Sequence, residues 1–307
     1  MNINLTMIVP DGYRHYQCIR EVIIYFDCFL TKMGFNVTIS KNYFYENKIN
    51  ILFLAFLLPP STQIPKNTII YNSEDLNKTT GWIFETESGK NYVNLLKRFP
   101  VIDYTETNLS KIDNEKKVYL PLLYCEKLVT NLSRSATNTF LFYGSLTESR
   151  RNILNEIKKH LRVVTLTPAQ SEYGFFRDKL IMQSKAIINL HKNEDVQYFE
   201  SVRCFYPLIN RIPVVSQDVD NLSDDRYRNS VIFLQRDQFV KEFLVAQGGS
   251  FGMAKLSGLL KRNFYEHRER IGSIRSWVTK HDDVFNIDKR GGAWIECPTR
   301  RACACCK

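Results

Sequence analysis

The sequence predicts an α/β fold of two doubly wound domains that face a central cleft. Three observations support this prediction. Short apolar runs typical of buried strands recur in both halves of the chain. Segments with helical spacing of apolar residues separate most of these runs. A polar stretch, 121–138, divides the pattern into two series of similar size. Strands that alternate with helices are typical of parallel sheets built from βαβ units.

The first series predicts an N-terminal, Rossmann-like domain over residues 1–130. Gly34 follows the longest predicted helix, as expected of a residue that ends a helix in the left-handed conformation. The turn after the first strand is indicated by Pro10, Asp11 and Gly12. The predicted strands are 3–9, 35–39, 51–56, 68–71, 101–104 and 117–120, and the predicted helices are 16–33 and 92–99.

The second series predicts another Rossmann-like domain over residues 131–285. Its predicted strands are 139–143, 162–167, 186–190, 212–216 and 230–234, and its predicted helices are 148–161, 175–184 and 196–209. The segment 251–279 is expected to be mostly helical. Residues 286–307 form a cysteine-rich tail that we expect to be disordered. Two doubly wound halves place a cleft between the loops at the carboxyl ends of their strands.

Composition favours a folded protein with an anionic partner. Hydrophobic residues make up 44% of the 307 residues and aromatic residues 13%, which excludes a disordered chain. The net charge of +10 suits nucleotide phosphates, nucleic acid or an anionic membrane surface. A basic composition that reflects only an AT-rich genome is the alternative.

The cysteines and the apolar segments indicate a cytoplasmic protein. Four scattered cysteines, at positions 18, 28, 125 and 204, lie mostly among apolar residues and suggest reduced thiols. The four in the tail lack the spacing of zinc ligands. No segment reaches the roughly 18 apolar residues that span a membrane, and the N-terminus lacks the pattern of a signal peptide. We therefore expect no metal site, no transmembrane segment and an intracellular location.

A glycine turn opens the second domain. Gly144 and Ser145 follow a predicted strand, and Thr147 is placed to cap the helix that follows. The free N–H groups of the first helical turn, together with Arg150 and Arg151, would bind a diphosphate. The alternative is a capped helix with two solvated arginines, because the segment matches neither a Walker loop nor a dinucleotide fingerprint.

The stretch 185–217 is the strongest candidate for a donor site. It reads as strand, polar loop, helix and strand, with His191 at the end of the first strand and Glu200 and Arg203 on the helix. Ligands of open α/β sheets bind after such strands. Glu200 would accept hydrogen bonds from a ribose, whose diol offers two donors. His191 would face the cleft and contact phosphate or sugar. The alternative is that Glu200 and Arg203 simply pair and His191 has a local partner.

Three residues in loops of the first domain are candidates for a catalytic base. Asp11 and His15 follow the first predicted strand, and Glu74 follows the strand 68–71. A base must reach the acceptor hydroxyl and have a usable pKa. The alternative for each is a capping role in a turn.

These segments resemble GT-B-fold glycosyltransferases of bacteria and viruses. Residues 189–191, Glu200, Arg203 and the strand 212–216 resemble the carboxylate-bearing segment of their C-terminal domain. That family has a glycine where this chain has Asn210 or Arg211. Segments 70–74, 102–108 and 142–151 add to the resemblance. It implies transfer of a sugar from a UDP- or GDP-sugar to the hydroxyl of a glycan, a protein or a modified nucleic acid, with no other cofactor and no metal held by the protein.

Other interpretations remain open. One is a glycosyltransferase that acts on modified bases in DNA, or a basic nucleic-acid-binding protein. No recognition module is visible and the basic residues are spread along the chain. Another is a non-catalytic domain that binds a nucleotide sugar or a partner, because a fold does not determine a function.

Overall fold

The computed structural model describes residues 1–77, 81–135, 137–168, 173–193, 195–196, 198–219 and 225–248. Two sequence predictions, the helical segment 251–279 and the cysteine-rich tail 286–307, lie outside these residues. Within the described part of the chain, no helix combines the length and apolar character needed to cross a bilayer.

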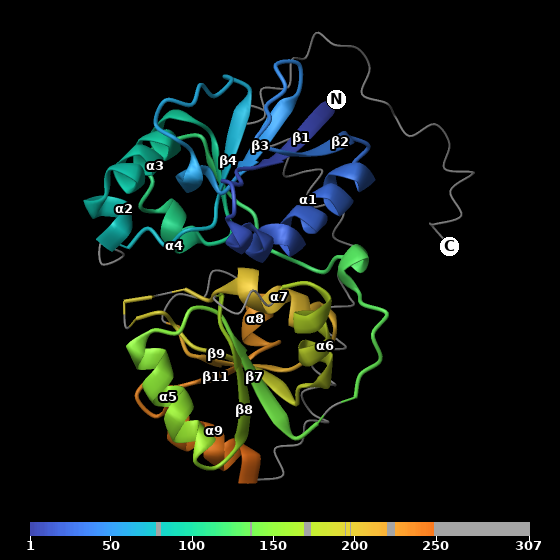
Figure 1. The fold of residues 1–307 in the computed structure, drawn as a ribbon, viewed down its shortest axis with the longest axis vertical. Coiled ribbons are helices and arrows are strands. Elements are labelled where there is room, and N and C mark those ends of the chain that lie inside the picture. The colour runs from blue at the N-terminus through green and yellow to red at the C-terminus, as the bar shows by residue number, and fades with distance from the viewer. Residues whose placement is uncertain are drawn as a thin grey trace.

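The first domain is built on a parallel sheet. Its described strands are β1 (Asn2–Met7), β2 (Asn36–Lys41), β3 (Ile49–Phe53), β4 (Thr68–Asn72), β5 (Val101–Asp103) and β6 (Lys117–Tyr119). They pair in the order β2-β1-β3-β4-β5-β6, and every pairing is parallel. The central strands are buried on both faces because helices cover them, which explains their nearly continuous apolar sequences. This sheet forms the upper half of Figure 1.

The second domain has a parallel sheet of its own. Its described strands are β7 (Thr139–Tyr143), β8 (Arg162–Leu166), β9 (Ala186–Asn189), β10 (Val214–Gln217) and β11 (Ile232–Leu234). Their order is β11-β10-β9-β7-β8, again with parallel pairing throughout. The α/β class and the two doubly wound sheets that the sequence predicts are therefore confirmed, and the two sheets lie one above the other in Figure 1.

The five helices predicted within the described residues are present, and the structure adds α2, α4, α8 and α9, which the sequence did not predict. The short 3-10 helices are labelled η1 to η3. Thr147 caps α5 by accepting a hydrogen bond from the N–H of Arg150, as predicted. The elements are η1 (Arg14–Ile19), α1 (Arg20–Lys32), η2 (Ala55–Leu57), α2 (Gly81–Glu85), α3 (Glu87–Arg98), α4 (Glu106–Leu109), η3 (Glu126–Leu128), α5 (Glu148–Lys158), α6 (Phe175–Gln183), α7 (Ser201–Ile209), α8 (Asp225–Arg228) and α9 (Phe239–Gly248).

Three of the predicted helices differ from the prediction by several residues. The helix predicted for 92–99 begins at Glu87. The helix predicted for 16–33 is a 3-10 helix followed by α1. The helix predicted for 196–209 begins at Ser201, so Glu200 is the residue before the helix and not part of it. Its backbone ψ of 66° is not helical. This boundary matters because a residue at that place directs its side chain differently from one within the helix.

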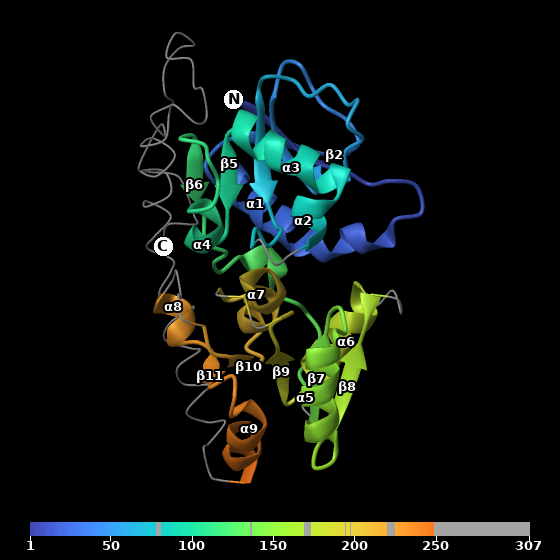
Figure 2. The same cartoon turned by 90° about the vertical axis from the view of Figure 1, so that its left-hand side faces the viewer.

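The two domains share a continuous apolar core. One cluster of buried side chains includes residues of β1 and α1 as well as residues of β9 and α7. The rings of Tyr25 on α1 and Phe205 on α7 meet edge to face, 6.4 Å apart between centroids. Tyr104 after β5 meets Tyr198 before α7 in the same way, at 6.0 Å. Helix α7 therefore packs at the junction of the domains (Figure 2).

Candidate active site

A cleft of about 290 Å³ lies between the two domains. Many of the residues that line it follow strands of both sheets: Ser73, Glu74 and Asp75 come after β4, Tyr104 after β5, Gly144 and Ser145 after β7, Thr167 and Pro168 after β8, and Lys192 after β9. The carboxyl ends of both sheets thus open on this space, where open α/β sheets bind their ligands. The central cleft predicted from the sequence is confirmed.

Glu200 is held at the edge of the cleft by two arginines. Its carboxylate accepts hydrogen bonds from both terminal nitrogens of Arg203, each at 3.1 Å, and from Nη2 of Arg150 at 3.2 Å. Burial alone would raise the pKa of Glu200, but Arg203 and Arg150 outweigh it and lower that pKa. The side chain is 19% exposed. Glu200 is therefore an ionised, oriented carboxylate with part of its surface open to the cleft.

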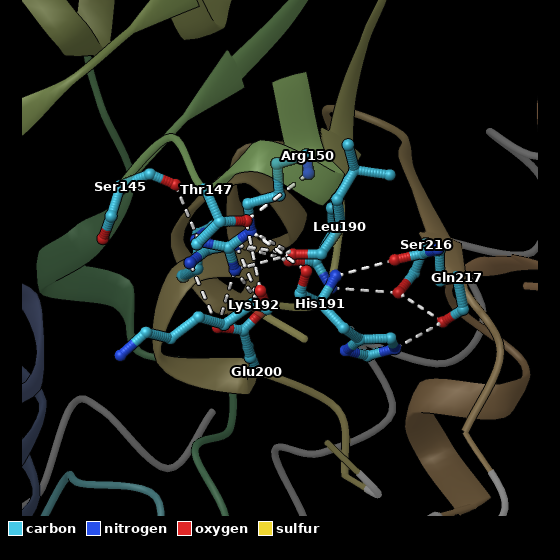
Figure 3. Close-up of polar contacts among 11 residues, drawn as sticks. Ser145, Thr147, Arg150, Leu190, His191, Lys192, Glu200, Ser216 and Gln217 are labelled. Atoms are coloured by element: carbon cyan, nitrogen blue, oxygen red, sulfur yellow. Dashed lines mark hydrogen bonds and ion pairs between the residues drawn. The ribbon is translucent and has the colours of Figure 1, made fainter. Parts of the chain in front are cut away.

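Arg150 binds protein groups with its whole guanidinium. Nε and Nη2 donate to the carbonyl of Leu190 at 3.0 and 2.7 Å, and Nη1 donates to the carbonyl of Ser145 at 2.9 Å. The side chain is 1% exposed, and burial lowers its pKa to about 10. Arg150 therefore joins the glycine turn, the end of β9 and Glu200 (Figure 3). Its predicted contact with a diphosphate would require some of these hydrogen bonds to be exchanged.

Gly144 allows Arg203 to approach the turn after β7. Its backbone φ is +138°, which side chains of L-residues rarely adopt. A Cβ at this position would lie 3.2 Å from Nη2 of Arg203. The glycine is therefore required both by the turn and by the guanidinium that lies beside it.

Three predicted site residues do not line the cleft. His191 is 3% exposed, and its ring points toward Gln217, whose carbonyl lies 3.1 Å from Nε2 (Figure 3). Burial lowers the pKa of His191 to about 4, so the ring is neutral. The expectation that it faces the cleft is wrong, because the ring is buried beside Gln217 at the end of β10. Asp11 is exposed in the turn after β1, and Arg151 is exposed on α5.

Glu74 lines the cleft from a loop of the first domain that side-chain hydrogen bonds hold in place. The side chain of Asn72 accepts a hydrogen bond from the N–H of Glu74 at 3.1 Å and donates one to its carbonyl at 3.0 Å. Asn108 donates to the same carbonyl at 3.0 Å. Burial raises the pKa of Glu74 to about 7, although the charge of Lys192 acts in the opposite direction. Glu74 is thus a carboxyl group that titrates near neutrality.

His15 also lines the cleft, but its ring is engaged. Its Nδ1 shares a short hydrogen bond with the hydroxyl of Tyr173, which belongs to the second domain. Burial lowers the pKa of His15. The ring is therefore uncharged near neutral pH and contributes to the contact between the domains.

The sequence prediction missed an ion pair that crosses the cleft. Arg177 on α6 donates from Nη2 to Glu21 on α1 at 2.5 Å, and it also pairs with its neighbour Asp178 at 2.8 Å. Both side chains of the first pair are less than 10% exposed. A signal was present, because Glu21 lies between the apolar residues Ile19 and Val22 of an amphipathic helix, where a charged residue needs a buried partner.

Lys192 is a second cleft residue that the prediction missed. It directly follows His191 and lines the cleft with an exposed side chain. Its carbonyl accepts a hydrogen bond from the hydroxyl of Thr147 at 3.1 Å, which ties the loop after β9 to the start of α5.

Among the described residues, no three or more His, Cys, Asp or Glu side chains gather as they would around a metal ion.

Sequence comparisons relate the chain to viral proteins. No family model matches it. An uncharacterized protein of Acanthamoeba polyphaga mimivirus is 30% identical over 181 residues, which are 57% of this chain and 57% of the relative. A second uncharacterized mimivirus protein is 25% identical over 248 residues, 76% of this chain and 33% of the relative. The chain thus covers about half of the first relative and a third of the second.

Structural comparisons identify the fold. The T4 phage beta-glucosyltransferase in complex with UDP-glucose superimposes with a TM-score of 0.51 at 11% identity, over 92% of this chain and 100% of that one. An alpha1,3-fucosyltransferase has a TM-score of 0.51 at 10% identity, over 92% and 90% of the two chains. TarM has a TM-score of 0.51 at 13% identity, over 78% and 55%. The chain therefore has the GT-B fold that these glycosyltransferases share.

Proposed function

We propose that this protein is a glycosyltransferase that moves a sugar from a nucleotide diphosphate sugar to an acceptor hydroxyl. One observation carries the proposal: the carboxylate of Glu200 is fixed by Arg150 and Arg203 at the edge of the interdomain cleft, with part of its surface exposed. A carboxylate accepts both hydroxyl donors of a ribose, and Glu200 would do so by exchanging some of its contacts with Arg150 at the exposed edge of the side chain. The donor is a UDP- or GDP-sugar, and UDP is favoured because T4 phage beta-glucosyltransferase was solved with UDP-glucose.

The diphosphate of the donor would lie between the glycine turn and the loop after β9. Helix α5 presents its first N–H groups there, and these groups favour an anion. Lys192 and Arg203 line the same part of the cleft and supply positive charge. As the bond to the sugar breaks, negative charge grows on the leaving diphosphate, and these groups would stabilise it. We propose no metal in this role.

Glu74 is the best candidate for the base. It lines the cleft from the domain opposite Glu200, and its pKa of about 7 suits proton abstraction near neutral pH. In the proposed reaction the acceptor hydroxyl passes its proton to Glu74, its oxygen bonds to the sugar, and the nucleoside diphosphate leaves. His15 is the second candidate for this role, and its hydrogen bond to Tyr173 would have to open first.

The experiment that tests the function is a thermal-shift screen of nucleotides and nucleotide sugars. A ligand that binds only the folded state raises the melting temperature. We expect a rise with UDP, or with GDP, and with the corresponding sugar nucleotides. No rise with any nucleotide would overturn the proposal. Transfer or slow hydrolysis of the bound donor, lost in Glu74→Gln while nucleotide binding persists, would separate an enzyme from a non-catalytic binding domain.

Modified DNA is a second candidate for the acceptor. The net charge of +10 favours it, as does the match to the full length of T4 phage beta-glucosyltransferase, which is described as a DNA-modifying enzyme. Binding to duplex DNA should then weaken steeply with salt, because phosphate contacts release counterions. A salt-independent affinity, or none, would count against a DNA acceptor.

A further inference from the structure

A second cavity lies beside helices α2, α3 and α4, which cluster on one side of the first domain's sheet (Figure 1), and Asp195 of the second domain also lines it. It has a volume of about 540 Å³. This value falls within the roughly 300–1,000 Å³ typical of pockets that bind small molecules. Nothing in the proposed donor site uses this cavity.

The lining of the cavity is mainly apolar. Leu76, Leu96 and Ile112 are buried members of one core cluster, and Phe84 and Val93 pack against that cluster while remaining partly exposed. A ligand would therefore contact aliphatic and aromatic side chains, whose burial from water favours binding of an apolar group.

The charged side chains of the lining balance one another. Lys97 and Lys111 contribute two positive charges, and Asp113 and Asp195 contribute two negative charges. The cavity thus offers no net charge to attract an ion. Its chemistry selects an uncharged, apolar group.

The cavity and the interdomain cleft are adjacent along two segments of chain. Glu74 lines the cleft and Leu76 lines the cavity. Because consecutive Cα atoms are about 3.8 Å apart, the Cα atoms of these two residues are separated by at most about 7.6 Å. In the other domain Lys192 lines the cleft and Asp195 lines the cavity.

A hydrogen bond between the domains joins these two segments. Nδ2 of Asn77 donates to the carbonyl of Asp195 at 2.8 Å, and Nζ of Lys111 donates to the side-chain oxygen of Asn77. One molecule that reaches past this contact would have its apolar part in the cavity and a hydroxyl near Glu74.

We propose that this cavity binds an apolar alkyl or aryl group of the acceptor, so that the acceptor is an amphipathic molecule. The inference rests on the proposed function, because it assigns Glu74 to the acceptor hydroxyl. It adds a substrate class, which neither the fold nor the donor site determines.

The test compares two ligands that differ only in their apolar part. Hexyl β-D-glucoside and methyl β-D-glucoside are titrated calorimetrically into the full chain. We expect the hexyl compound to bind at least tenfold more tightly. Phe84→Ala and Val93→Ser should each remove most of this preference. Phe44→Ala is the matched control, because Phe44 also packs partly exposed against the same core cluster but does not line the cavity.

The outcomes separate this inference from the proposed function. Equal affinities of the two glucosides, or no binding of hexyl glucoside, would overturn it. A hexyl preference that both cavity variants leave intact would place the alkyl group elsewhere and would also overturn it. A parallel titration with UDP reports on the donor site alone. If the unmodified protein binds hexyl β-D-glucoside but not UDP, the proposed function is contradicted. If it binds UDP but not hexyl β-D-glucoside, only the proposed class of acceptor is contradicted.

Discussion

The hydroxyl of Tyr143 donates a hydrogen bond of 2.5 Å to the backbone carbonyl of Arg203. Pro207 lies four residues after Arg203 inside α7. A proline has no N–H, so this carbonyl lacks its usual helical partner. Tyr143 replaces that partner. Because Tyr143 directly precedes Gly144, the same bond ties the glycine turn to the helix that carries Arg203.

This relationship predicts coupling between Tyr143 and Pro207. Tyr143→Phe should lower the free energy of unfolding by about 1–3 kcal/mol, because it leaves a buried carbonyl unsatisfied. In a Pro207→Ala background the cost should be smaller, since position 207 then supplies an N–H to that carbonyl. Urea denaturation of the two single variants and the double variant measures the coupling. Additive costs would contradict the explanation.

The Glu21–Arg177 pair predicts a large stability effect at the domain junction. Glu21→Ala should lower the free energy of unfolding by about 3 kcal/mol, because it leaves a buried guanidinium without its main partner. The value lies at the low end of the usual range because Asp178 still pairs with Arg177. Equilibrium denaturation checks it.

The matched control is an exposed pair, Lys159 with Glu156. Glu156→Ala should change the free energy of unfolding by no more than about 1 kcal/mol. Replacing both buried partners, as Glu21→Leu with Arg177→Met, should recover part of the loss, because both charges of the buried pair are removed and only the more exposed Asp178 loses a partner. Equal effects of Glu21→Ala and Glu156→Ala would refute the assignment of a buried pair.

Glu200 should determine nucleotide affinity. We expect Glu200→Ala to weaken binding of UDP more than tenfold, equivalent to about 1.4 kcal/mol or more. The loss should be larger for UDP than for pyrophosphate, because the proposed partner of the carboxylate is the ribose. Titration calorimetry with both ligands measures the difference, with Glu156→Ala as the control in the same domain. Unchanged affinity for UDP would remove Glu200 from the donor site.

The rate of transfer should depend on the ionisation of Glu74. A base acts when deprotonated, and burial raises the pKa of this carboxyl to about 7. We therefore expect kcat/KM to rise with pH through about 7 and to level off above it. Lys192→Met should move this limb to higher pH, because the charge of Lys192 lowers the pKa of Glu74. A profile that is flat across this range, or activity retained in Glu74→Gln, would argue for another base.

Arg211 adopts a left-handed backbone conformation, with φ of 61°. It follows α7, at a place where a left-handed residue, usually glycine, often ends a helix. A non-glycine residue in this conformation costs roughly 1–2 kcal/mol. Arg211→Gly should therefore be about 1 kcal/mol more stable than Arg211→Ala, which loses the same side chain but retains the strain. Thermal denaturation of the two variants gives the difference. Equal stabilities would show that the backbone is unstrained there.

Much of the fold was predictable because its signals are local. Buried strands such as β4 and β9 are short apolar runs, and the predicted strand β7 agrees with the structure at both ends. Thr147 could be recognised as a helix cap from its place before α5. The start of α7 was not predictable in this way. Apolar residues from Val196 onward suggested an earlier helix, but they are buried against neighbouring segments instead.

The sequence by itself determined the α/β class, the two sheets and the group of polar residues that follow their strands, because the period of apolar residues specifies each element locally. Only the tertiary structure decided how those polar residues are used. In the folded chain His191 contacts Gln217, Arg150 donates to backbone carbonyls, and Glu21 pairs with Arg177 across the cleft. These contacts join residues far apart in the chain, and their burial sets the charge that each side chain carries.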